Sequence, residues 1–115
     1  MIRRLSIAGA FIVALTWVGE ARAQDAEKGK QVYESATPKC KVCHSIGGVG
    51  NAKGNLDDVG SKLSAADIKA WLRTPKEMTA KAKALRKPPM PAYSKEKLPD
   101  ADLDNLTAYL SSLKK

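Results

Sequence analysis

The chain has 115 residues, with 20 Lys or Arg, 12 Asp or Glu and a single His, so its formal net charge at pH 7 is +8. This length allows one small domain and excludes a multidomain protein. A positive charge favours nucleic acid or acidic proteins as partners, and because the sequence has an export signal and no recognisable nucleic-acid module, acidic proteins are favoured.

The first part of the chain has the features of that export signal. The positive pair Arg3–Arg4 precedes an apolar run over residues 5–18, and the small-x-small sequence Ala-Arg-Ala follows at 21–23. We therefore expect residues 1–23 to be a cleaved bacterial-type secretory signal peptide, residues 24–115 to form the mature domain, and the protein to be periplasmic. The apolar run is shorter than the about 20 residues of a membrane span, so no stable membrane insertion is expected after cleavage; an uncleaved anchor is the alternative.

A first helix is predicted between Asp25 and Pro38. Asp25 is a typical N-cap residue, and a proline ends a helix because it has no backbone donor. One face of this helix carries residues at spacings of three and four: Gly29, Val32, Tyr33 and Ala36.

The sequence Cys40-Lys41-Val42-Cys43-His44 follows this helix and has the spacing of a c-type haem attachment site. Two thiols at this spacing reach two vinyl groups on one edge of a porphyrin, and the next side chain, the only imidazole, reaches the iron. A redox dithiol and a zinc site are the alternatives. The first needs a βαβ setting, for which the sequence shows no strand. The second needs a carboxylate as fourth ligand beside Cys40, Cys43 and His44.

The centre of the chain combines a loop and a helix. Residues 46–60 contain five glycines and no apolar period, so we expect a loop that wraps one side of a flat cofactor. Ser64 and Asp67 have the spacing of a capping box and start the best-specified helix, which Pro75 ends. Its apolar face consists of Ile68, Trp71 and Leu72.

Two methionines of the mature chain offer a thioether. Met78 lies in a basic stretch over residues 76–87 that we expect to be flexible or to form a short turn of helix. Met90 lies between Pro89 and Pro91, which keep the backbone on an extended path. Rigidity favours Met90 as a ligand, and Met78 is expected to pack or to lie exposed.

The last helix is predicted over residues 100–113. Aspartates occupy its first turn, where negative charge is favourable. Tyr109 lies beside an apolar stripe formed by Leu103, Leu106, Leu110 and Leu113. We expect this stripe to pack on the first helix near Tyr33 and Gly29, where the small glycine allows a close approach.

In this order, the elements resemble the class I cytochrome c family over essentially the whole mature chain. They are a helix before Cys-x-x-Cys-His, a glycine-rich loop, a central helix, a Met-Pro-x-Tyr loop and a C-terminal helix. The resemblance implies an all-α fold, a small cytochrome c fold of three to five short helices and long loops around one covalently bound haem c. It also implies that Cys40 and Cys43 form the thioethers, that His44 is the proximal iron ligand, and that Met90 is the distal one.

The resemblance places four further residues at the haem site. Trp71 is expected near the propionate edge, and Tyr93 belongs to the Met-Pro-x-Tyr loop. Gly54 and Leu56 match the family's Gly-Pro-x-Leu segment, except that Lys53 and Gly54 replace Gly-Pro. In the family the proline carbonyl accepts a hydrogen bond from the proximal histidine, and the Gly54 carbonyl can take that role on a less rigid backbone.

These residues predict an electron-transfer protein rather than an enzyme. Histidine and methionine ligands leave no open iron position for a substrate and raise the reduction potential. We expect a monomeric periplasmic one-electron carrier whose lysines, such as Lys39, Lys41 and Lys87, orient acidic redox partners through a small, weak interface. Two alternatives stay open: a cytochrome subunit of a periplasmic dehydrogenase or oxidase, and a five-coordinate haem enzyme or gas-binding module if Met90 is not a ligand.

Overall fold

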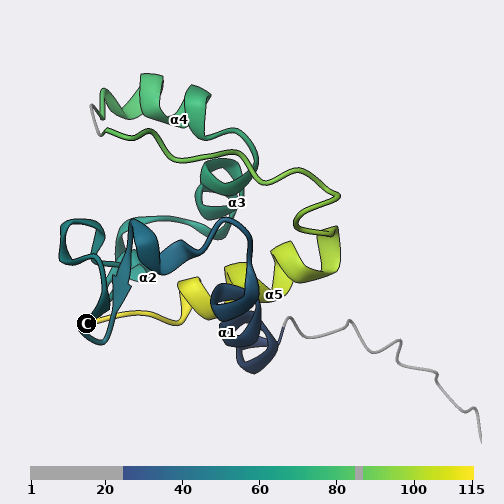
Figure 1. Ribbon diagram of the computed structural model, residues 1–115. Helices are drawn as coiled ribbons and strands as arrows, with labels where there is room; N and C mark the ends of the chain where they lie inside the picture. The colour runs from purple at the N-terminus through teal and green to yellow at the C-terminus, as the bar shows by residue number, and fades with distance from the viewer. Residues whose placement is uncertain (1–24, 85–86) are drawn as a thin grey trace, which may run out of the picture.

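The computed structural model describes residues 25–84 and 87–115. The predicted signal peptide over residues 1–23 lies outside the described residues, as does Arg86 of the basic stretch. Within the described ranges the chain forms five α-helices, two 3₁₀-helices and one two-stranded hairpin (Figure 1). The helices are α1 (Ala26–Ser35), η1 (Cys40–Val42), η2 (Ala52–Gly54), α2 (Val59–Lys62), α3 (Ala65–Arg73), α4 (Pro75–Ala82) and α5 (Asp100–Ser111). The predicted all-α class is confirmed.

Side-chain caps begin the two helices that the sequence specifies best. The Asp25 carboxylate accepts hydrogen bonds from the Glu27 and Lys28 amides at 3.0 and 3.2 Å, and α1 starts at the next residue. The Ser64 hydroxyl accepts a hydrogen bond from the Asp67 amide at 3.1 Å at the start of α3. Each contact satisfies a backbone donor of a first helical turn, which has no partner within the helix.

Helices α1 and α5 cross at a point where only glycine fits (Figure 1). A Cβ atom added at Gly29 would overlap the backbone carbonyl of Asn105 on α5. Tyr33 and Tyr109 pack edge to face, with ring centroids 6.2 Å apart, and the Asp25 amide donates to the Asn105 side chain at 3.0 Å. The predicted packing of the first helix on the last is therefore confirmed.

Tyr33 is buried at this crossing, and its hydroxyl has no hydrogen-bond partner among the described residues. Burial is the main cause that raises the pKa of Tyr33 to about 12. In an unfolded chain the pKa of a tyrosine is about 10. The unfolded chain therefore releases this proton at lower pH than the folded chain, and the free energy of unfolding falls as the pH rises from about 10 to 12.

We expect a Tyr33→Phe variant to lose stability less steeply than the wild type between about pH 10 and 12, because phenylalanine has no proton to release. At pH 7 the variant should be at least as stable, because the missing hydroxyl leaves no group unpaired. Unfolding in guanidinium chloride at a series of pH values checks both expectations. Parallel stability curves for variant and wild type above pH 10 would contradict the first.

The prediction that residues 46–60 form a loop without regular structure is wrong in part. Strands β1 (Ser45–Ile46) and β2 (Val49–Gly50) pair antiparallel. Gly47 and Gly48 form the two-residue turn between them with φ angles of 58° and 81°, the left-handed backbone that such tight hairpins require. Strands of two residues are too short to show an alternating pattern in the sequence.

Helix α4 confirms the short helix that was one of the two alternatives for the basic stretch, and it contradicts the flexible one around Met78. Pro75 ends α3, because the preceding Thr74 leaves helical geometry, and it also occupies the first position of α4, where its missing amide costs no hydrogen bond. Helix α4 ends at Ala82, and the next residue, Lys83, has a left-handed backbone with a φ of 52°. Met78 is therefore half-buried on an ordered helix.

The apolar core lies between α1, α3, α5 and the segment that precedes α5. Its buried members are Tyr33, Ala36, Ile68, Leu72, Tyr93, Leu98, Leu103, Leu106 and Leu110. Helix α5 ends at Ser111, two residues before the predicted end, so Leu113 lies beyond the helix and is partly buried, whereas Leu103, Leu106 and Leu110 are buried as predicted. Within the part of the chain that the structure describes, every helix is too short or too polar to cross a bilayer.

Candidate functional site

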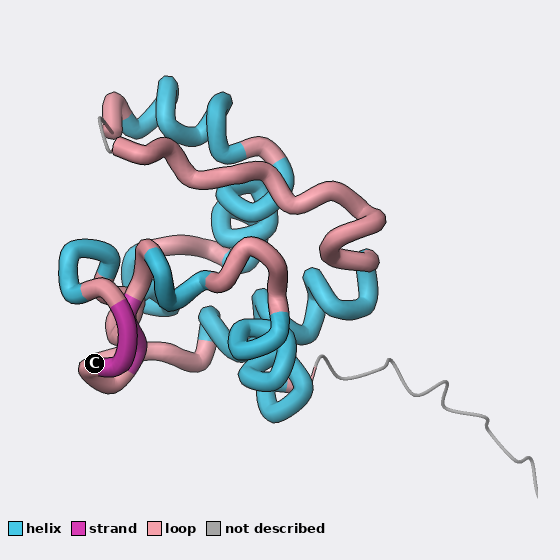
Figure 2. The backbone as a smooth tube through the Cα atoms, in the orientation of Figure 1, coloured by secondary structure: helices cyan, strands magenta, loops and turns pink. Residues whose placement is uncertain are grey.

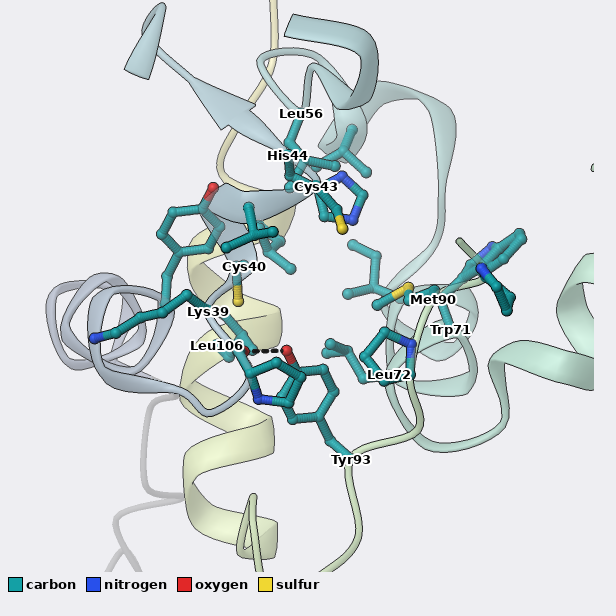
Figure 3. Close-up of a pocket in the computed structure, with 18 of the residues that line it drawn as sticks. Lys39, Cys40, Cys43, His44, Leu56, Trp71, Leu72, Met90, Tyr93 and Leu106 are labelled. Atoms are coloured by element: carbon teal, nitrogen blue, oxygen red, sulfur yellow. Dashed lines mark hydrogen bonds between the residues drawn. The ribbon is translucent and has the colours of Figure 1, made fainter. Parts of the chain in front are cut away.

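An apolar cavity of about 360 Å³ lies within the fold (Figure 3). Its walls come mainly from the turn at residues 38–44, the segment 56–63, helix α3, helix α5 and the proline-rich segment 88–93. Its larger aliphatic and indole side chains are Val42, Leu56, Val59, Leu63, Ile68, Trp71, Leu72, Leu106 and Leu110. A concave apolar site with a few polar groups is typical of cofactor binding.

The 3₁₀-helix η1 brings two thiols and an imidazole to one wall of this cavity. The Cys43 and His44 amides both donate to the Cys40 carbonyl, at 3.1 and 2.9 Å, which turns the chain tightly. The three side chains all line the cavity, and Figure 3 shows both sulfur atoms on the cavity side. Burial is the main cause that raises the pKa of the Cys40 thiol.

The His44 ring is oriented by the backbone of Gly54. His44 Nδ1 lies 3.0 Å from the Gly54 carbonyl oxygen. Because a carbonyl only accepts, Nδ1 carries the proton and donates, and this tautomer gives Nε2 the lone pair that a metal requires. Gly54 is itself buried. The contact thus has the form that the resemblance implies, although this chain has glycine where the family has proline.

Hydrogen bonds around Asn51 hold the Gly54 carbonyl in place. The Gly54 amide donates to the Asn51 carbonyl at 3.0 Å, and the Asn51 amide donates to the His44 carbonyl at 2.9 Å. The Lys53 amide donates to the Asn51 side chain, also at 3.0 Å. A proline at position 54 would have no amide for the first of these bonds. Asn51 was not predicted as a site residue, because its only signal in the sequence is its suitability as a cap for a short turn.

Met90 reaches the same cavity from the opposite side. It is half-buried and lines the cavity together with Pro89 and Pro91. Figure 3 shows its sulfur atom directed into the cavity and facing the wall that carries Cys43 and His44. Of the two methionines that the structure describes, only Met90 lines the cavity.

Tyr93 links the Met90 side of the cavity to the other wall. Its side chain is 4% exposed, its hydroxyl donates to the Pro38 carbonyl at 2.5 Å, and its amide donates to the Leu72 carbonyl at 2.9 Å. Burial is the main cause that raises the pKa of Tyr93, so the hydroxyl keeps its proton at neutral pH and remains a donor. Tyr93 thus ties the proline-rich segment 88–93, which carries Met90, both to α3 and to the chain that leads into Cys40.

The remaining residues assigned from the sequence also meet here. Leu56 and Trp71 line the cavity, and Gly54 lies behind His44, whose ring it binds through its carbonyl. Arg73 was not predicted as a site residue; its guanidinium donates to the carbonyls of Tyr93 and Leu98. These carbonyls lie 20 and 25 positions further along the chain, so no local pattern could indicate the contact.

The lysines near the turn at residues 38–44, the attachment turn, differ in their surroundings. Lys39 Nζ donates to the Glu34 backbone carbonyl at 2.8 Å, and Lys41 Nζ lies 3.1 Å from the Glu34 carboxylate. Both therefore lie against the end of α1. Lys87, which directly precedes the proline-rich segment 88–93, is exposed.

The donor set and the apolar walls fit a covalently held haem. Two thiols and an imidazole on one wall, with a thioether opposite, define a c-type haem protein. The sequence model of the family described as Cytochrome c matches residues 26–114, so the chain belongs to the cytochrome c family. Cytochromes c bind haem c through cysteines, and Cys40 and Cys43 are the two cysteines of this chain. The family match therefore decides against the redox dithiol and the zinc site. No match was found among curated proteins or among solved structures.

Proposed function

We propose that this haem-binding electron-transfer cytochrome is a periplasmic one-electron carrier in which His44 and Met90 are the axial ligands of one haem c. The observation that carries the proposal is the Met90 thioether facing the wall that presents His44 (Figure 3). The hydrogen bond from His44 Nδ1 to Gly54 supports it, because it orients the ring for ligation through Nε2. Two such ligands leave no open iron position, which favours a carrier over an enzyme.

The chain's own residues would serve electron transfer in three ways. Thioether bonds from Cys40 and Cys43 would keep the cofactor from dissociating. The hydrogen bond to Gly54 would hold the His44 ring, and Pro89 and Pro91 restrict the backbone at Met90, so the same ligands would be kept in both oxidation states. The apolar side chains of the cavity exclude water and so favour the less charged, reduced iron. The haem, when bound, supplies reversible one-electron chemistry.

The attachment turn is the part of the surface where we place the contact with redox partners. Val42, between the two cysteines, is 67% exposed, and Lys39 and Lys41 flank it. An exposed apolar side chain between two lysines, one of which is paired with Glu34, suits an acidic partner that must bind and dissociate quickly. The carrier is proposed to be a monomer that takes up and releases electrons through this one face.

Export is part of the proposal. We infer that residues 1–23 are a cleaved signal peptide and that residues 24–115 form the mature domain. The family match begins at residue 26, just after this boundary, which supports the assignment. Periplasmic fractionation and the intact mass of the purified protein test it: the expected mass is that of residues 24–115 plus one haem, and a mass that includes residues 1–23 would contradict cleavage.

A potentiometric titration of the purified holoprotein tests the carrier role. We expect a single reversible one-electron transition, and ferrous protein that binds carbon monoxide only slowly, because Met90 must first leave the iron. Rapid carbon monoxide binding would instead assign the chain to five-coordinate haem enzymes or gas-binding modules. Co-purification in fixed stoichiometry with a dehydrogenase or oxidase from the native periplasm would assign it as a subunit of that complex.

A further inference from the structure

The Met90 segment, residues 87–99, runs from the side of α4 to α5 without regular secondary structure (Figure 2). Its main-chain hydrogen bonds are few. The Tyr93 amide donates to the Leu72 carbonyl at 2.9 Å, and the Leu98 amide donates to the Ser94 carbonyl at 2.8 Å and closes a turn within the segment. The position of Met90 therefore depends on side chains that hold this segment.

Arg73, the last residue of α3, holds the segment at two carbonyls. Its Nη1 donates to the Tyr93 carbonyl at 2.9 Å and to the Leu98 carbonyl at 2.7 Å, and its Nη2 donates to Asp100 Oδ1 at 2.8 Å. The Arg73 side chain is 20% exposed, so these charge-assisted bonds are partly shielded from water. A guanidinium has five donors in a fixed planar arrangement, which allows one side chain to serve three acceptors.

We propose that Arg73 is a positioning residue that keeps the Met90 thioether on the iron. This inference rests on the proposed ligation by His44 and Met90. Tyr93, three residues after Met90, is held through its amide by Leu72, through its carbonyl by Arg73 and through its hydroxyl by Pro38. Without Arg73 the Tyr93 and Leu98 carbonyls lose their charged donor, the segment has one anchor fewer on α3, and Met90 leaves the iron more often.

Three variants of the holoprotein test this role. Arg73→Gln removes the charge and the planar set of guanidinium donors, whereas Arg73→Lys keeps the charge but places it at a single nitrogen. Lys69→Gln is the matched control. Lys69 also lies on α3 and forms an ion pair with Asp104 of α5 at 2.8 Å. Like Arg73, it therefore joins α3 to α5, but it makes no such contact with the Met90 segment.

The readout is the rate at which cyanide binds to the ferric protein, because cyanide binds only after the sulfur has left. We expect Arg73→Gln to raise this rate about tenfold, which corresponds to roughly 1.4 kcal/mol, and to weaken the ferric sulfur-to-iron charge-transfer band. Arg73→Lys should give a smaller increase, and Lys69→Gln should stay within about twofold of the wild type. Unfolding in guanidinium chloride is measured for all three, so that loss of stability is separated from loss of ligation.

The inference would be overturned if Arg73→Gln binds cyanide at the wild-type rate and loses only as much stability as Lys69→Gln. Arg73 would then stabilise the fold without affecting the ligation by Met90. If Arg73→Gln does not accumulate with haem, the cyanide-binding rate of Arg73→Lys is used instead. A rate equal to that of the wild type then overturns the inference. The wild-type spectrum separates this failure from failure of the proposed ligation. A wild type without the charge-transfer band contradicts Met90 as a ligand, whereas a wild type with the band and variants without effect contradict only the role of Arg73.

Discussion

Replacing Met90 by alanine is expected to abolish the ferric sulfur-to-iron charge-transfer band completely and to convert the iron to a high-spin, five-coordinate state. Met90 is the only described methionine on the cavity wall, and the chain has no second histidine to replace it. The reduction potential should also fall, because a thioether ligand favours ferrous iron. Absorption spectra of the ferric protein and a potentiometric titration measure the two effects.

Met78→Ala is the control for this result. Met78 lies half-buried on α4 and does not line the cavity. Its removal should leave the band and the potential unchanged and lower the free energy of unfolding by about 1–2 kcal/mol, less than a fully buried methionine would. If the band disappears in Met78→Ala and persists in Met90→Ala, the ligand is Met78 and the proposed geometry is wrong.

Gly29→Ala is expected to have the largest effect on stability. Its Cβ would overlap the Asn105 carbonyl at the crossing of α1 and α5 and would also press on Tyr109. Such overpacking against backbone costs about 3 kcal/mol, which exceeds the roughly 1 kcal/mol gained when alanine replaces glycine within a helix. For a domain of this size, a net loss of about 2 kcal/mol lowers the melting temperature by roughly 10 °C, which calorimetry of the holoprotein measures.

Gln31→Ala provides the comparison on the same helix. Gln31 is exposed on α1, so its truncation should change the free energy of unfolding by less than about 0.5 kcal/mol. A Gly29→Ala protein as stable as Gln31→Ala would mean that α1 and α5 do not approach as closely as the structure shows.

Features with a local physical basis could be predicted from the sequence. Asp25 and Ser64 cap helices because their side chains reach amides two or three residues away. The attachment turn is equally local, since the spacing of Cys40, Cys43 and His44 fixes which side chains share one wall of the cavity. The contact between the first and last helices could be expected because each has an apolar face that needs a partner.

Features that depend on distant partners could not be predicted. The hairpin after His44 consists of two-residue strands that exist only because they pair with each other. Arg73 is an ordinary helix-end residue by sequence, and its carbonyl acceptors become visible only once Tyr93 and Leu98 are placed. Pro75 is recognisable as a helix end, but its second role at the first position of α4 requires that residues 76–82 also be helical.

The absorption spectrum of the wild-type ferric protein, expressed in a periplasm with haem maturation factors, tests the central claim most directly. The proposed ligation predicts one covalently attached haem whose iron is low-spin and six-coordinate and shows the weak charge-transfer band of sulfur ligation. High-spin ferric iron would contradict ligation by Met90 and the carrier role. A protein recovered without covalently bound haem would contradict the attachment through Cys40 and Cys43.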